Sequence, residues 1–136
     1  MITGHCECRK ISFEANCEVS EYSHCHCSQC RRLHGAAYAS FAEIELKYFK
    51  YLSNTDLLSS YASSGNHERI FCSNCGSNIM VILADYPETV YVAMGVINGD
   101  PKLPEPYHIY VGSKAPWHEI LDDCKQYNEE PFSLES

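Results

Sequence analysis

The chain has 136 residues, which fits one domain, residues 1–136, with a single buried core. Its formal net charge of −8 argues against a protein that binds the phosphate backbone of nucleic acids. No apolar run reaches the length of about 18 residues that predicts a membrane span, and without the basic and apolar regions of a signal peptide we expect a cytoplasmic protein, with the nucleus as the alternative.

Strand signals dominate the chain. Residues 11–15 alternate apolar and polar side chains, as a half-buried strand does, and residues 78–84 form the apolar run of a buried strand. The segments predicted as strands are 11–15, 37–41, 44–51, 68–71, 78–84, 89–97 and 107–111. Turn-forming residues separate them at 63–66, 85–87, 98–101 and 104–106. A short helix fits only after Cys30 or at 55–58, so the pattern indicates a mainly β domain.

The nine cysteines argue for bound metal rather than disulfides. Cysteines one or two residues apart are poor disulfide partners, and an odd number cannot all pair. Seven of the nine fall in three clusters, which are Cys6 with Cys8, Cys25 with Cys27 and Cys30, and Cys72 with Cys75. The other two, Cys17 and Cys124, stand alone, and we expect free thiols or small apolar side chains there.

Zinc is the metal that this thiolate spacing favours. A closed structural site takes four protein ligands, so seven cysteines suit two zinc ions, one with four ligands and one with three. The spacing leaves the pairing open, because the two C-x2-C pairs, at 27/30 and 72/75, could also share one ion. A three-cysteine site would keep a fourth position for water or for the thiol of a substrate.

The motifs, taken in order, resemble those of the glutathione-dependent formaldehyde-activating enzyme family, which includes the domain of centromere protein V. The matching motifs are G-H-C-E-C at 4–8, C-H-C-S-Q-C-R-R at 25–32, R-I-F-C-S-N-C-G-S at 69–77 and H-I-Y-V-G-S-K-A-P-W-H-E-I at 108–120. The resemblance extends over about residues 4–127. It implies a zinc-pinned, antiparallel, β-tent-like fold.

The resemblance also implies which cysteines share an ion. Cys6, Cys8, Cys72 and Cys75 would hold a structural zinc. Cys25, Cys27 and Cys30 would hold a second zinc, at which a substrate thiol binds.

The expected function follows from the three-cysteine site. Three thiolates make zinc a poor Lewis acid for hydrolysis but a suitable partner for a thiol, whose pKa it lowers. We interpret the chain as a carbon–sulfur lyase-type enzyme acting on glutathione adducts, for example in forming S-(hydroxymethyl)glutathione from glutathione and formaldehyde. Arg31 and Arg32 directly follow the last ligand, and we expect them to contact carboxylates of the substrate. The alternative is a non-catalytic, zinc-stabilised protein-interaction module.

Several residues near these motifs have no role that the sequence assigns. His24 and His26 flank Cys25 and could replace a thiolate or carry a proton, although exposed or supporting positions are more common for such residues. Trp117 is expected to pack as a core aromatic. The segment 122–127 departs from the Asp-Gly-Leu-Pro-like continuation of the family, which weakens any transfer of substrate contacts to the last residues.

Overall fold

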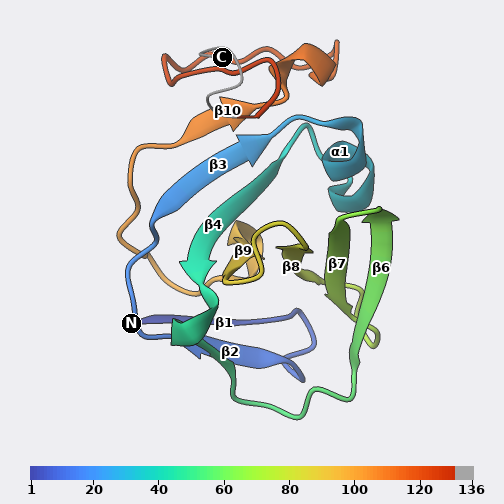
Figure 1. The fold of residues 1–136 in the computed structure, drawn as a ribbon, viewed down its shortest axis with the longest axis vertical. Helices are drawn as coiled ribbons and strands as arrows, with labels where there is room; N and C mark the ends of the chain where they lie inside the picture. Colours follow the sequence, from blue (N-terminus) through green and yellow to red (C-terminus); the bar gives the residue numbers. More distant parts are fainter. Residues whose placement is uncertain (131–136) are drawn as a thin grey trace.

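Residues 1–130 are described by a computed structural model of the chain. They form two β-sheets and one short α-helix (Figure 1). The three-stranded sheet has the order β1-β2-β5, and the seven-stranded sheet has the order β10-β3-β4-β9-β8-β7-β6. All neighbouring strands are antiparallel except β10 and β3. The expectation of a mainly β, antiparallel domain is therefore confirmed.

The strands are β1 (Ile2–His5), β2 (Ser12–Ala15), β3 (Glu21–Cys25), β4 (Ala39–Glu45), β5 (Phe49–Tyr51), β6 (Leu58–Ser64), β7 (His67–Cys72), β8 (Asn78–Leu83), β9 (Thr89–Ala93) and β10 (Tyr107–Ile109). The helix is α1 (Ser28–His34), and three 3-10 turns are η1 (Leu46–Tyr48), η2 (Met94–Val96) and η3 (Val111–Ser113). No helix among residues 1–130 is long and apolar enough to cross a membrane.

The main core lies between the two sheets. Phe13 of β2 stacks on Phe49 of β5 with ring centroids 5.1 Å apart, and the same cluster includes Ile44 of β4 and Val92 of β9. β2 alternates buried and partly buried side chains, which confirms the pattern expected for residues 11–15. A second, smaller cluster contains Phe41 and two of the cysteines, and packs separately from the main core.

The observed strand boundaries differ from the predicted ones where contacts with other parts of the chain determine where a strand begins or ends. Residues 37–41 and 44–51, predicted as two strands, form one strand, β4, followed by η1 and the short β5. The apolar run 89–97 leaves the sheet at Ala93, where η2 turns the chain away. Strands β1, β3 and β6 were not predicted. β1 is a four-residue strand with one strongly apolar residue, β3 is rich in polar residues and β6 is rich in serine.

The helix α1 begins before the place at which the sequence suggested it. Cys27 is its N-cap, and the Cys27 side chain accepts a hydrogen bond from the backbone N–H of Cys30. Gly35 ends the helix in the left-handed region, with φ of 59°, and donates to the Arg31 carbonyl. Asn78, at the start of β8, donates to the Leu33 carbonyl at 3.3 Å and so ties the helix to the sheet.

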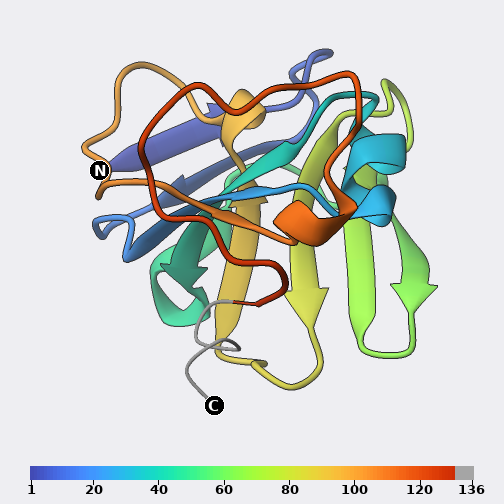
Figure 2. The same cartoon turned by 90° about the horizontal axis from the view of Figure 1, so that it is seen from above.

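The segment after β10 folds back along that strand (Figures 1 and 2). His108 donates its backbone N–H to the carbonyl of Lys125, and Tyr127 donates to the carbonyl of His108. Trp117 lies in this segment with 70 % of its surface exposed, so the expectation of a core aromatic is wrong.

Candidate metal centres and active site

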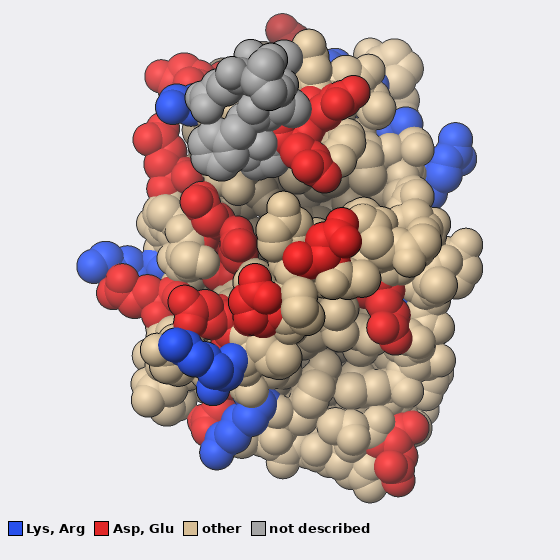
Figure 3. Space-filling model, viewed as in Figure 1, with Lys and Arg blue, Asp and Glu red and all other residues tan. Residues whose placement is uncertain are grey.

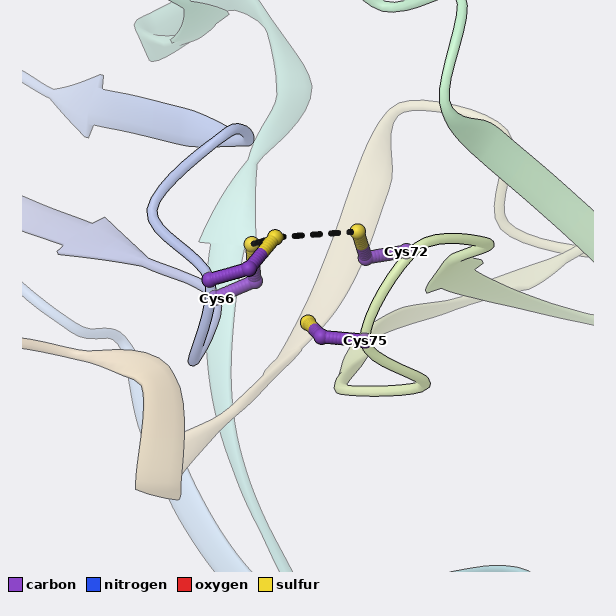
Figure 4. Close-up of side chains that lie close together, drawn as sticks. Cys6, Cys72 and Cys75 are labelled. Carbon is purple, nitrogen blue, oxygen red and sulfur yellow. Dashed lines mark hydrogen bonds between the residues drawn. The ribbon is translucent and has the colours of Figure 1, made fainter.

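Four cysteines from two distant parts of the chain meet at one end of the core. The turn between β1 and β2 carries Cys6 and Cys8. Cys72 is the last residue of β7, and Cys75 lies in the turn that follows. Their four sulfur atoms lie within 4.8 Å of one another, and Cys6 and Cys72 are fully buried. Figure 4 shows the side chains of Cys6, Cys72 and Cys75 pointing toward a common centre.

The spacing of these sulfurs fits a tetrahedral zinc ion. The Sγ atoms of Cys6 and Cys8 are 3.5 Å apart, and those of Cys8 and Cys72 are 3.8 Å apart. A tetrahedron with zinc–sulfur bonds of about 2.3 Å has edges of about 3.8 Å. A disulfide would need about 2.05 Å, and all nine cysteines are free. The donor set and its size therefore suit a closed zinc site.

Nearby donors already favour the thiolate form at part of this cluster. Hydrogen bonds from the hydroxyl and backbone of Ser77 lower the pKa of Cys75 to about 5. The Asn74 side chain lowers the pKa of Cys8, whereas burial raises that of Cys6 to about 11. The backbone N–H of Ile11 also points at the sulfur of Cys6, at 3.4 Å. The turn therefore supplies the N–H and O–H donors that a metal-bound thiolate requires.

The second cluster is made by Cys25 at the end of β3 and by Cys27 and Cys30 at the start of α1. Their sulfurs also lie within 4.8 Å of one another, and Cys25 and Cys30 are buried. Among residues 1–130, no further His, Cys, Asp or Glu completes this group. The structure thus brings the seven clustered cysteines together as one group of four and one group of three.

Three thiols this close cannot all ionise without a cation between them. Hydrogen bonding with Cys25 and Cys30 lowers the pKa of Cys27. Hydrogen bonding with Cys27 and Cys30, together with burial, raises the pKa of Cys25. A divalent cation at the centre would favour the thiolate form of all three.

The structure adds Arg69, for which the sequence predicted no role in the site. This side chain from β7 is only 5 % exposed, and its Nη1 lies 3.5 Å from the sulfur of Cys30. Its other hydrogen bonds go to Gln29 Oε1 at 3.5 Å and to Ser63 Oγ at 3.1 Å. No sequence signal located Arg69 beside the second cluster, because Arg69 and Cys30 are 39 positions apart in the chain and come together only in the folded protein.

The two arginines that the sequence did single out differ in their surroundings. Arg31 is partly buried, and its Nε is buried with no hydrogen-bond partner in the described part of the chain. Arg32 is exposed. Arg31 lies four positions after Cys27, on the same face of α1, whereas Arg32 points to another face. Arg31 therefore has a buried donor without a partner in the described residues, and Arg32 faces solvent.

Histidines gather next to the second cluster. His26 is fully buried, and its Nε2 lies 2.8 Å from Nδ1 of His108, whose Nε2 lies 3.0 Å from the carboxylate of Asp122. Nε2–H of His108 donates to the carboxylate. Nδ1 of His26 has no partner among residues 1–130. Asp122 lies in the segment that departs from the family pattern.

His24 belongs to the same group of rings. Its Nδ1 is 2.7 Å from Ser40 Oγ, and its ring contacts those of Tyr22, Tyr38 and His108. Burial and the neighbouring His108 lower the pKa of His24 to about 4, and burial also lowers that of His26 to about 4. Neither histidine belongs to a metal-ligand group in the described residues.

A cavity of about 420 Å³ has Ala39, the sheet partner of Cys25, in its wall, although none of the three cysteines of the second cluster lines it. Strand β9 ends at Ala93, where it pairs with Phe41 of β4, and it pairs with Met80 of β8 one residue earlier. The residues of β4 and β8 beyond this end, which include Ala39 and Asn78, have no partner in β9 and line the cavity. Ala39 also packs in the cluster that contains Cys25 and Cys30. Polar groups of Tyr22, His34, Tyr38, Ser40, Ser77 and Asn78 line the cavity. The two lone cysteines, 17 and 124, lie in neither metal-ligand group.

Comparisons with known proteins agree with this arrangement. The chain matches the family model described as glutathione-dependent formaldehyde-activating enzyme over residues 1–113. An uncharacterized lyase of Schizosaccharomyces pombe is 34% identical over 76 residues, or 56% of this chain and 53% of that protein, so the match spans about half of its length. A protein of Halomonas elongata named as a putative glutathione-dependent formaldehyde-activating enzyme is 26% identical over 141 residues, covering 88% of this chain and 81% of that one.

A solved structure shares the fold. The crystal structure of a Rhodobacter sphaeroides protein superposes with a TM-score of 0.61 at 21% identity and covers 76% of this chain and 97% of its own. The resemblance read from the motifs is thus confirmed by independent comparisons. Because the family model spans most of the chain and both cysteine clusters, this protein belongs to the glutathione-dependent formaldehyde-activating enzyme family.

Proposed function

We propose that the chain is a zinc-dependent enzyme of the carbon–sulfur lyase type that acts on glutathione adducts, such as S-(hydroxymethyl)glutathione. The observation that carries the proposal is the incomplete ligand set of the second cluster. Cys25, Cys27 and Cys30 converge, and no fourth metal-ligating side chain in the described part of the chain joins them. A purely structural zinc takes four protein ligands. Family membership and the lyase name of the fission-yeast relative support the same reading.

Zinc held by three thiolates would lower the pKa of a thiol at its fourth position and keep that thiol ionised. In the overall reaction, the glutathione sulfur bonds to the formaldehyde carbon, and the carbonyl oxygen takes up one proton for the one that the thiol loses. The protein holds and orients the reactants for this addition. The reverse direction breaks the same carbon–sulfur bond.

The surroundings of the second cluster suit an anionic peptide thiol. The unpartnered Nε of Arg31 is a donor that a substrate carboxylate could accept from. The adjoining cavity has the size usual for small-molecule sites and offers Ser40 and Asn78 for hydrogen bonding. We assign the peptide part of glutathione to this cavity and its sulfur to the second cluster.

Two measurements test the proposal on zinc-loaded protein. In calorimetric titrations, glutathione should bind, and S-methylglutathione, which keeps the carboxylates but has no free thiol, should bind at least about ten-fold more weakly. Exchange spectroscopy with ¹³C-formaldehyde should show faster adduct formation than without protein. Equal binding of both compounds together with an unchanged exchange rate would contradict the assignment.

The alternative of a non-catalytic interaction module has one supporting observation. Trp117 and Leu121, both in the segment after β10, are strongly exposed large apolar side chains. A module of this kind would need only the four-cysteine site, so it gives no reason for the second cluster. We therefore favour the enzyme.

A further inference from the structure

Arg69 is a buried cation that the proposed reaction does not yet use. It is 5 % exposed, and its three hydrogen bonds go to the sulfur of Cys30, to the Gln29 side chain and to the Ser63 hydroxyl. Gln29 and Ser63 are neutral, so they cannot balance the charge of the guanidinium.

No carboxylate of residues 1–130 forms an ion pair with this guanidinium. The ion pairs found among residues 1–130 involve other basic residues, and none includes Arg69. An unpaired guanidinium in the interior is strongly unfavourable, because it has lost its hydration without gaining an anion. The acceptor beside it that can become anionic is the sulfur of Cys30.

The formal charges balance when this cluster is ionised and holds metal. Three thiolates and one zinc ion carry a net charge of −1, and Arg69 brings the total to zero. The guanidinium also donates a hydrogen bond directly to one ligand, at 3.5 Å. Hydrogen bonds to the charged form of an acid favour that form.

We propose that Arg69 is the charge partner of the three-cysteine cluster and thereby sets the affinity of that cluster for zinc. It is a positioning residue, because it acts through the ligand Cys30 and touches no substrate. The inference rests on the zinc site of the proposed function but not on glutathione being the substrate.

The test compares Arg69→Gln with Arg69→Lys, and it uses Arg32→Gln as the matched control. Arg32→Gln removes the same charge from the exposed side of α1. Competition with a chromophoric chelator measures the affinity of each zinc. We expect Arg69→Gln to weaken one of two zinc ions by about ten- to a hundred-fold, the effect of one lost charge-assisted hydrogen bond. Arg69→Lys should lose less, and Arg32→Gln should match the wild type.

Cobalt substitution supplies a readout that a merely structural role would not change. Sulfur-to-cobalt charge-transfer absorption reports the thiolates bound to the metal. In a cobalt titration carried past the first equivalent, the absorption of the three-cysteine cluster should need about ten- to a hundred-fold more free cobalt in Arg69→Gln than in the wild type. The absorption of the four-cysteine cluster and the far-ultraviolet circular dichroism spectrum should be unchanged. Equal zinc affinities in Arg69→Gln and wild type, or an equal loss in Arg32→Gln, would overturn the role of Arg69.

Two further outcomes are decisive. A wild-type protein that binds one zinc would overturn the zinc site of the proposed function and, with it, this inference, whereas two zinc ions with an unaffected Arg69→Gln would overturn only the inference. If Arg69→Gln does not fold, the zinc affinity of Arg69→Lys becomes the deciding measurement. Retained affinity for the second zinc supports the role of the charge, and a ten-fold loss or more overturns it.

Discussion

Neighbouring residues of α1 differ in what their side chains can reach. Cys27, Cys30 and Arg31 are spaced so that they share one face of the helix, and Arg32 is turned away from it. The sequence treated the two arginines as equivalent, because both follow the last cysteine. The helix geometry and the unpartnered Nε of Arg31 separate them.

Arg31→Ala should therefore weaken glutathione binding, and Arg32→Ala should serve as its matched control. The lost charge-assisted hydrogen bond corresponds to about 1.5–3 kcal/mol, or roughly ten- to a hundred-fold in affinity. Calorimetric titration of zinc-loaded variants measures the change. A small neutral thiol should bind both variants as it binds the wild type, because it has no carboxylate. Equal losses of glutathione affinity in the two variants would argue against the assignment of Arg31.

The two cysteine clusters are built from different kinds of element. The four-cysteine cluster joins the β1–β2 turn to the end of β7 and the turn that follows it. A bound ion would therefore connect the two sheets across the 64 positions that separate Cys8 from Cys72. The three-cysteine cluster joins the end of one strand to the helix that follows it. Metal at the first cluster therefore constrains the whole fold, and metal at the second constrains one local turn.

Cys72→Ser and Cys27→Ser should consequently have different effects. Structural zinc binding is worth on the order of 10 kcal/mol, which is comparable with the stability of an ordinary domain. Cys72→Ser should unfold or strongly destabilise the protein. Cys27→Ser should lose the proposed second zinc and the proposed activity while keeping its β structure. Thermal melting, circular dichroism and native mass spectrometry follow these changes, and unfolding of Cys27→Ser would instead indicate a second structural site.

The elements also show what a sequence pattern can predict. Strands β2 and β8 were predicted, since their apolar residues alternate or run together. Strand β6 was not, because Leu58–Ser64 takes its stability from pairing with β7 rather than from its own composition. The motifs predicted how the clustered cysteines group. Arg69 and the contact between His108 and Asp122 could not be predicted, because they depend on segments brought together by the sheet.

At the scale of the whole molecule, acidic residues outnumber basic ones, 18 to 10. Figure 3 shows acidic side chains spread over one face, with lysine and arginine mostly at its margins. Beneath this acidic surface, the half-buried His24 and the buried His26 favour the neutral form. The pKa of His24 and that of His26 are both lowered to about 4, chiefly by burial.

The stability of the domain should therefore fall as the pH is lowered below neutrality. The two histidines have pKa values of about 6.5 when unfolded, so the unfolded chain binds more protons between about pH 6.5 and pH 4. Their contribution is complete above this window and is lost as the pH falls through it. Urea denaturation at several pH values, with the zinc content checked at each, measures the slope.

His24→Gln provides the control for acid release of zinc, because it removes a titrating group and leaves all seven clustered cysteines in place. The dependence of its free energy of unfolding on pH should be less steep than that of the wild type, by up to one proton. If the two slopes coincide, His24 makes no contribution to the acid sensitivity.

Strand β7 carries Arg69 and ends at Cys72, three residues further along the same backbone. An ion at the four-cysteine cluster would anchor the end of this strand and thereby hold the guanidinium against Cys30. The two metal-binding events are then linked, and linkage of binding free energies is reciprocal. In a cell short of zinc, we therefore expect sequential metallation. The four-cysteine cluster should bind zinc first, and the three-cysteine cluster should bind its ion mainly in molecules whose four-cysteine cluster is already occupied.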